Sequence, residues 1–212
     1  MKILSIDPLA VPDVKVITFG RFRDHRGYFT ETCRKSDLFG PSATDFLAGL
    51  EFLQCNESFS RPGVVRGLHF QWNPHMGKLV RTIAGRMIDL ALDIRKGSPT
   101  HGKIVACDMP ASADDDCGRW IWVPAGFAHG NFFSEPTTIE YFCTGEYSPG
   151  CEAGIRPTAE DIDWSLCDAA LKAEFDKAAA DGSGMSEKDR AGLTLAAWGA
   201  DDRSKEFIHG RC

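Results

Sequence analysis

The chain has 212 residues, 43% of them hydrophobic and 25% charged, which suits one globular domain with a small appended subdomain. The net charge of −6 argues against broad nucleic-acid binding, and the absence of any run of about 18 apolar residues argues against a membrane span. The first ten residues lack the apolar stretch of a signal peptide. We therefore expect a cytoplasmic protein whose eight cysteines are free thiols.

From Val14 to about Tyr147, short runs rich in β-branched and aromatic residues alternate with Gly, Pro and Asp. This pattern predicts a mainly β fold, a sandwich or a barrel. The expected strands are Val14–Phe22, Gly27–Arg34, Glu51–Ser58, Val64–Gln71, Lys78–Ala84, Arg86–Ile94, Gly102–Cys107, Trp120–Val123, Gly130–Phe133 and Thr137–Cys143.

The run Met87–Ile94 alternates with a period of two, as a strand does. One of its faces is wholly aliphatic and predicts a buried surface. The other face carries Asp89 and Asp93. That face would meet solvent in an open sheet, or line the cavity of a barrel that holds a ligand.

The last quarter of the chain changes character and favours helices. Thr158–Asp161 resembles a capping box, and Ala169–Ala180 is rich in strong helix formers. Ser186 is expected to open a further short helix that reaches Trp198. The polar tail Gly199–Cys212 is expected to be loosely held. We thus predict a β-barrel over residues 1–157 and a C-terminal helical extension over residues 158–212, packed on the barrel.

The segment Pro124–His129 has the form Pro-x-Gly-x-x-His directly after a strand, and it resembles the second motif of the cupin superfamily. Metal-binding cupins also carry a His-x-His pair in their first motif. Here that pair would begin at His69, but its second position is Gln71. The resemblance therefore implies a cupin-type jelly-roll barrel without a metal or other cofactor. His129 could equally be a hydrogen-bonded core histidine.

A closer resemblance is carried by motifs spread from Val14 to Trp164. They are Asp24–Glu31, Gln54–Ser58, Val65–Gln71 (containing Arg-Gly-Leu-His), Gly77–Arg81, Asp93–Thr100, Trp122–Gly130, Tyr141, Tyr147–Pro149 and Ile162–Trp164, with a weaker match at Ser186–Asp189. In this order they resemble the dTDP-4-dehydrorhamnose 3,5-epimerase family. The family's substrate is a nucleotide-linked 4-keto-6-deoxyhexose, whose C4 carbonyl acidifies the protons on C3 and C5. Epimerisation needs a base, a proton donor on the opposite ring face, and a group that holds the enolate oxygen.

The resemblance implies three catalytic residues. His69 matches the general base, and Asp189 matches the carboxylate that orients its ring. Tyr141 matches the proton donor on the opposite face. From the residues alone, His69 and Tyr141 could be structural, and Asp189 could be an ordinary acidic residue in the first turn of a helix.

The resemblance also implies the substrate-binding residues. Lys78 would lie beside the C4 oxygen, and Arg66 would grip the diphosphate. The others are Arg26, Glu31, Gln54 and Asn56, which would complete the sugar and nucleotide pocket, and Asp89 with His129, an interior polar pair behind the substrate. The family forms homodimers with an exchanged N-terminal strand, which would bring Arg26 into the partner's site.

Strict alternation along Val64–Gln71 would place Arg66 and His69 on opposite faces of the strand. The resemblance requires both side chains in one cavity. Gly67, which lies between them, is therefore expected to form a β-bulge.

Several alternatives stay open. The same catalytic residues would serve an enzyme that epimerises only C3 or only C5 of another nucleotide-linked 4-keto sugar, such as a heptose. Glu146 and Phe142 stand where the family usually has an aromatic residue and a lysine, so the nucleotide base is undecided. A metal-free cupin that only binds a nucleotide sugar is a third possibility. A metal-dependent oxygenase is disfavoured by Gln71.

Overall fold

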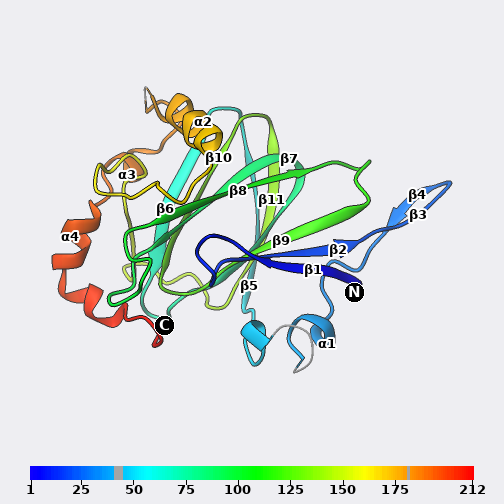
Figure 1. Ribbon diagram of the computed structural model, residues 1–212, viewed down its shortest axis with the longest axis horizontal. Coiled ribbons are helices and arrows are strands. Elements are labelled where there is room, and N and C mark those ends of the chain that lie inside the picture. The colour runs from blue at the N-terminus through cyan, green and yellow to red at the C-terminus, as the bar shows by residue number, and fades with distance from the viewer. Residues whose placement is uncertain (41–44, 181) are drawn as a thin grey trace.

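The computed structural model describes residues 1–40, 45–180 and 182–212 (Figure 1). The fold is mainly β, as predicted, with a few short helices. The strands are β1 (Ile3–Pro8), β2 (Lys15–Gly20), β3 (Phe22–Asp24), β4 (Gly27–Phe29), β5 (Gln54–Ser60), β6 (Val65–Gln71), β7 (Lys78–Asp93), β8 (Ile104–Ala111), β9 (Cys117–Val123), β10 (Phe127–Phe133), β11 (Thr137–Cys143) and β12 (Glu152–Gly154).

Two antiparallel layers share the long strand β7. Its first part pairs with β9 and β11 in the order β1-β2-β9-β7-β11-β5, and its second part pairs with β8 and β10 in the order β8-β7-β10-β6-β12. The two strands expected at Lys78–Ala84 and Arg86–Ile94 are therefore one strand. Gly85 lies between the two parts with a φ of +93°, a conformation that favours glycine.

One hydrophobic cluster fills the space between the layers and includes Val80, Met87 and Ile139. The aliphatic face of Met87–Ile94 packs outward instead. Ile88, Leu90 and Leu92 lie in a second cluster, between the β6–β10 layer and the C-terminal residues. Asp89 and Ala91 point between the layers, so the opposite face of this strand lines the barrel interior.

The helices differ from the prediction in detail. α1 (Lys35–Leu38) was not expected. α2 (Ala169–Ala179) forms as expected, but its N-terminal cap is Asp168, whose carboxylate accepts two backbone N–H groups. The expected capping box at Thr158–Asp161 is wrong, because these residues form turns that pack against the barrel.

Ser186 caps α3 (Glu187–Arg190), as expected, but this helix ends after one turn. A separate helix, α4 (Leu195–Ala200), carries Trp198. The expectation of a loosely held tail is wrong, because Phe207 is fully buried and its ring packs against Phe70 and Trp198. A polar composition hid this single aromatic anchor.

The C-terminal residues cover one outer face of the barrel, as Figure 1 shows for α2, α3 and α4. Phe175 and Trp198 of this extension share a hydrophobic cluster with Leu68 and Leu90 of the barrel. The division at residue 157 stays a prediction, and this shared core supports an extension that folds onto the barrel. No helix among the described residues is long and apolar enough to span a membrane.

Candidate active site

Two adjoining hollows of about 290 and about 250 Å³ are lined by residues of β5, β6, β7 and β11. His69, Lys78 and Tyr141 line both of them, so they lie where the hollows meet. The three side chains come from β6, β7 and β11. The motif residues thus converge on one cavity.

A β-bulge in β6 brings two of the predicted residues into this cavity. His69 lies opposite His129 on β10, and Arg66 lies opposite Asn131, so β6 advances three residues while β10 advances two. Gly67 has a φ of +114°, and a Cβ there would lie 2.6 Å from the Cα of Gly130. The predicted bulge is confirmed, and it lets Arg66 and His69 both line the cavity.

His69 is paired with a carboxylate from the other end of the chain. Its Nε2 lies 2.6 Å from Oδ1 of Asp189, which α3 presents to the barrel. Burial acts to raise the pKa of Asp189, but hydrogen bonds from His69, Ser186 and the Gly67 N–H outweigh it and lower that pKa. An ionised Asp189 favours the tautomer in which His69 Nε2 carries the hydrogen, which leaves Nδ1 able to accept a proton.

Lys78 and Tyr141 face the same space from β7 and β11. Burial lowers the pKa of the Lys78 ammonium and raises the pKa of the Tyr141 phenol. Tyr141 is therefore protonated at neutral pH and can donate a proton. Lys78 places an ammonium where the two hollows meet, in a buried setting that strengthens its interaction with a nearby charge.

Four further predicted residues line the cavity: Gln54, Asn56, Arg66 and His129. Gln54 and Asn56 lie side by side on β5, where Nε2 of Gln54 donates to Oδ1 of Asn56 at 3.0 Å. Arg66 donates to Oγ of Ser60 at 3.0 Å and leaves part of its guanidinium exposed at the rim. These groups can bind hydroxyl and phosphate oxygens.

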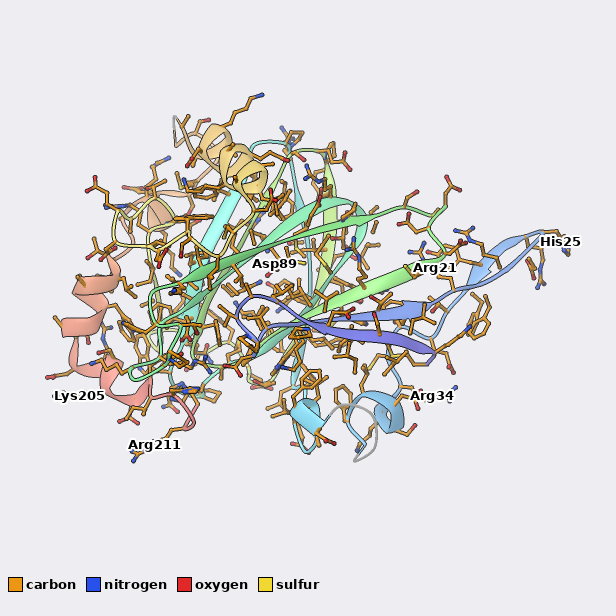
Figure 2. All side chains as sticks on the ribbon, in the orientation of Figure 1. Arg21, His25, Arg34, Asp89, Lys205 and Arg211 are labelled. Atoms are coloured by element: carbon orange, nitrogen blue, oxygen red, sulfur yellow. The ribbon has the colours of Figure 1, made fainter. Side chains whose placement is uncertain are left out.

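Three predicted residues, Arg26, Glu31 and Asp89, do not line these hollows. Arg26 lies at the tip of the β3–β4 hairpin, where its side chain is 78% exposed and pairs with Asp24. Figure 2 shows the adjacent His25 at the far end of this hairpin, well away from the barrel. Glu31 binds Arg34 and the N-terminal amine of Met1, and these contacts lower its pKa to about 2.

Asp89 and His129 form the expected interior pair. His129 Nε2 lies 2.7 Å from Asp89 Oδ2, and both side chains are buried. Figure 2 shows Asp89 within the barrel. Among the described residues, Oδ1 of Asp89 and Oδ1 of Asn131 lack a hydrogen-bond partner.

Sequence reasoning missed a group of three residues at the cavity mouth. Tyr147 Oη donates to Oε1 of Glu152 at 2.7 Å, and Lys188 Nζ donates to the same oxygen at 2.6 Å. Tyr147 and Glu152 line one hollow and Lys188 the other. Tyr147 and Lys188 lie inside recognised motifs, so their position could have suggested them. Glu152 carried no such signal.

Gln71 stands at the position where metal-binding cupins carry a second histidine, and its side chain holds neighbouring loops. Both ends of the Gln71 amide bind backbone groups of neighbouring loops. Within the part of the chain that the structure describes, no group of three or more His, Cys, Asp or Glu side chains is arranged to hold a metal.

The His–Asp pair, the phenol and the ammonium that meet in this cavity can together move protons beside a carbonyl, which is the chemistry of an isomerase. Comparison with known families agrees. The chain belongs to the dTDP-4-dehydrorhamnose 3,5-epimerase family, whose model matches residues 8–197.

Individual relatives bear the same name. The dTDP-4-dehydrorhamnose 3,5-epimerase of Neisseria gonorrhoeae is 36% identical over 213 residues, which are 99% of this chain and 57% of that protein, so the chain spans little more than half of this relative. The enzyme of the same name from Sinorhizobium fredii is 40% identical over 79% of this chain and 84% of its own. The crystal structure of the Legionella pneumophila dTDP-6-deoxy-D-glucose-3,5-epimerase, in complex with dTDP-4-keto-L-rhamnose, is similar with a TM-score of 0.72 and 32% identity. This similarity covers 91% of this chain and 93% of that one.

Proposed function

We propose that the protein epimerises a nucleotide-linked 4-keto-6-deoxy sugar at C3 and C5 by proton abstraction and return. The observation that carries the proposal is the meeting of the His69–Asp189 pair, Tyr141 and Lys78 in one cavity. Family membership supports the same activity.

In the proposed reaction, Nδ1 of His69 takes the proton from C3 or C5. The electrons of the broken C–H bond form a C=C bond to C4, and the C4 carbonyl becomes an enolate oxygen. The ammonium of Lys78 stabilises the negative oxygen. The enolate then collapses back to the ketone as the carbon takes the Tyr141 hydroxyl proton on the opposite face. Proton transfer from His69, through solvent, restores the tyrosine. Asp189 stabilises the imidazolium formed in between.

We place the sugar between His69 and Tyr141 and the nucleotide toward Arg66, Gln54 and Asn56. Arg66 offers a partly exposed guanidinium, which suits a diphosphate. The Legionella structure holds a dTDP-linked sugar, which supports a nucleotide sugar as the ligand class. The eight free thiols fit a reducing compartment, and we propose a cytoplasmic enzyme.

We also propose a homodimer in which the N-terminal strands are exchanged and Arg26 enters the partner's cavity. The β3–β4 hairpin projects from the barrel and exposes Phe22, Tyr28 and Phe29, which supports a role in contact with another chain. Mixing the inactive variants Arg26→Ala and His69→Ala tests this arrangement after subunit exchange. Recovered activity is expected only if Arg26 acts on the partner's site, because one mixed site would then contain both residues. A mixture without activity would reject the exchange.

The activity is tested by NMR of a dTDP-linked 4-keto-6-deoxyglucose in D2O. Loss of the proton signals at both C3 and C5 is the expected result. Loss at one carbon alone would indicate a mono-epimerase, and no loss would favour a binding protein. Tyr141→Phe is expected to slow epimerisation more than exchange, because the base on the other face is intact.

A further inference from the structure

The amide of Gln71 is occupied at both ends by main-chain groups. Its Nε2 donates to the carbonyl oxygens of Pro74 at 3.0 Å and of Glu146 at 3.1 Å. Its Oε1 accepts the N–H of Ser148 at 2.9 Å. Gln71 is 5% exposed, so these bonds form in a site largely closed to water. Both amide hydrogens are donated and the amide oxygen accepts a third bond, so the side chain is held in one orientation.

The same loop is held from a second strand. Oε1 of Gln54 accepts the N–H of Tyr147 at 2.8 Å. Three successive residues of the β11–β12 connection are therefore bound by glutamine side chains from β5 and β6. Residues 144–151 form no regular structure. The N–H groups of Thr144 and Cys151 bind main-chain oxygens, whereas the main-chain groups of residues 146–148 bind these glutamine side chains.

The residue at the centre of this loop is Tyr147. Its side chain lines the cavity beside Gln54, although the residue is 54% exposed, and its hydroxyl is fixed by Glu152. An aromatic ring held at the mouth of a polar cavity offers a face on which a planar base can stack. The ring can do so only if its loop is held in place, because ordering the loop on binding would weaken affinity.

We propose that Gln71 is a positioning residue, which fixes the loop of Tyr147 and thereby sets the affinity for the nucleotide end of the substrate. It lies two residues after His69, but it serves binding whereas His69 serves proton transfer. The assignment deepens the proposed function and rests on it. The position that would hold a metal ligand in other cupin barrels here supports a binding loop.

The first test measures the dissociation constant of dTDP by calorimetry and the exchange rate at saturating substrate. Gln71→Leu removes the three bonds at similar volume and is expected to raise the dissociation constant about tenfold, while the saturated rate changes by less than about twofold. In a Tyr147→Ala background, the same substitution should have almost no further effect on the dissociation constant, because Gln71 acts through that ring. Thr137→Val is the control, since it also removes a buried hydrogen-bonding side chain but lies outside the cavity lining.

The second test replaces Gln71 by Glu and varies the pH. An ionised glutamate still accepts the Ser148 N–H, but it repels the carbonyl oxygens of Pro74 and Glu146. Burial raises the pKa of such a carboxyl, and the protonated acid can again donate to one carbonyl. The dissociation constant relative to wild type should therefore be about tenfold higher at pH 8 and approach the wild-type value as the pH falls toward 5. Merely structural damage would give a ratio that does not depend on pH.

The proposal is overturned if Gln71→Leu leaves the dissociation constant within about twofold of wild type, if its effect persists in the Tyr147→Ala background, or if the Gln71→Glu ratio is flat with pH. Failure of wild-type protein to bind dTDP would also overturn it. These results can be told apart from a failure of the proposed activity. If the protein does not exchange the sugar protons but binds dTDP in a way that depends on Gln71, the epimerase activity is rejected and the positioning role of Gln71 stands.

Discussion

Among the described residues, two His–Asp pairs at the barrel differ mainly in their surroundings. His69 and His129 face each other across β6 and β10, with carboxylate oxygens at 2.6 and 2.7 Å. The His69 side chain is 34% exposed, whereas that of His129 is 8% exposed. Asp189 reaches His69 from the C-terminal extension, whereas Asp89 lies on β7, which is adjacent to β10.

A His–Asp pair does not by itself make a histidine a general base. A histidine can exchange a proton with a substrate only if one ring nitrogen is paired and the other is accessible. His69 meets both conditions. His129 also lines one hollow, but its side chain is only 8% exposed, so its pair is better suited to supporting the cavity wall.

The largest effect is expected for His69→Ala. Removing the base should lower the solvent exchange rate by roughly a thousandfold, whereas His129→Ala should lower it by less than about tenfold. NMR in D2O with circular dichroism as a folding control measures both. Equal losses in two folded variants would show that the two pairs share the chemistry.

The carboxylate partners of the two histidines should also differ, with Asp189 contributing more to kcat than Asp89. Asp189→Asn leaves the shape intact but removes the charge that stabilises the imidazolium, so kcat should fall roughly a hundredfold with substrate affinity little changed. Asp89→Asn should affect kcat by less than about tenfold. Steady-state kinetics on both variants decide the matter, and a reversed order would assign the base to His129.

At high pH, activity should be lost because Lys78 loses its charge. Because burial lowers the pKa of Lys78 and raises that of Tyr141, rising pH discharges the ammonium first. The kcat should then fall about tenfold for each pH unit above the Lys78 pKa. Lys78→Arg keeps a charge at high pH and should move this limb upward. An unmoved limb in that variant would point to another group.

The smallest effect concerns stability in acid. The pKa of Asp189 is lower in the folded protein than in the unfolded chain, so its stabilising contribution is present above the unfolded value of about 3.9 and is lost as pH falls through the folded value. Urea unfolding between pH 5 and pH 2 should show a shallower loss of stability in Asp189→Asn than in wild type. Parallel curves would mean that the pair does not contribute to folding.

The sequence predicted much of the fold, because strand periodicity is a local property. Most of the strands expected between Val14 and Cys143 are present in the structure, and the β-bulge expected at Gly67 is confirmed. β12 was missed, since Glu152–Gly154 has no strand signal and forms a strand only by pairing with β6. The buried tail was missed because one residue, Phe207, holds it.

The residue pattern alone indicated the β class, because strand periodicity is a local property. The residues for proton transfer and the bulge at Gly67 were implied by the resemblance to the epimerase family. Only the tertiary structure decided which residues meet. It joined Asp189 to His69 across 120 positions, tied Tyr147 to Lys188 through Glu152, and turned Gln71 toward the loop of Tyr147. It also left Arg26 and Glu31 outside the cavity of their own chain. The physical reason is that burial and hydrogen-bond geometry arise from packing between distant segments, which no local pattern encodes.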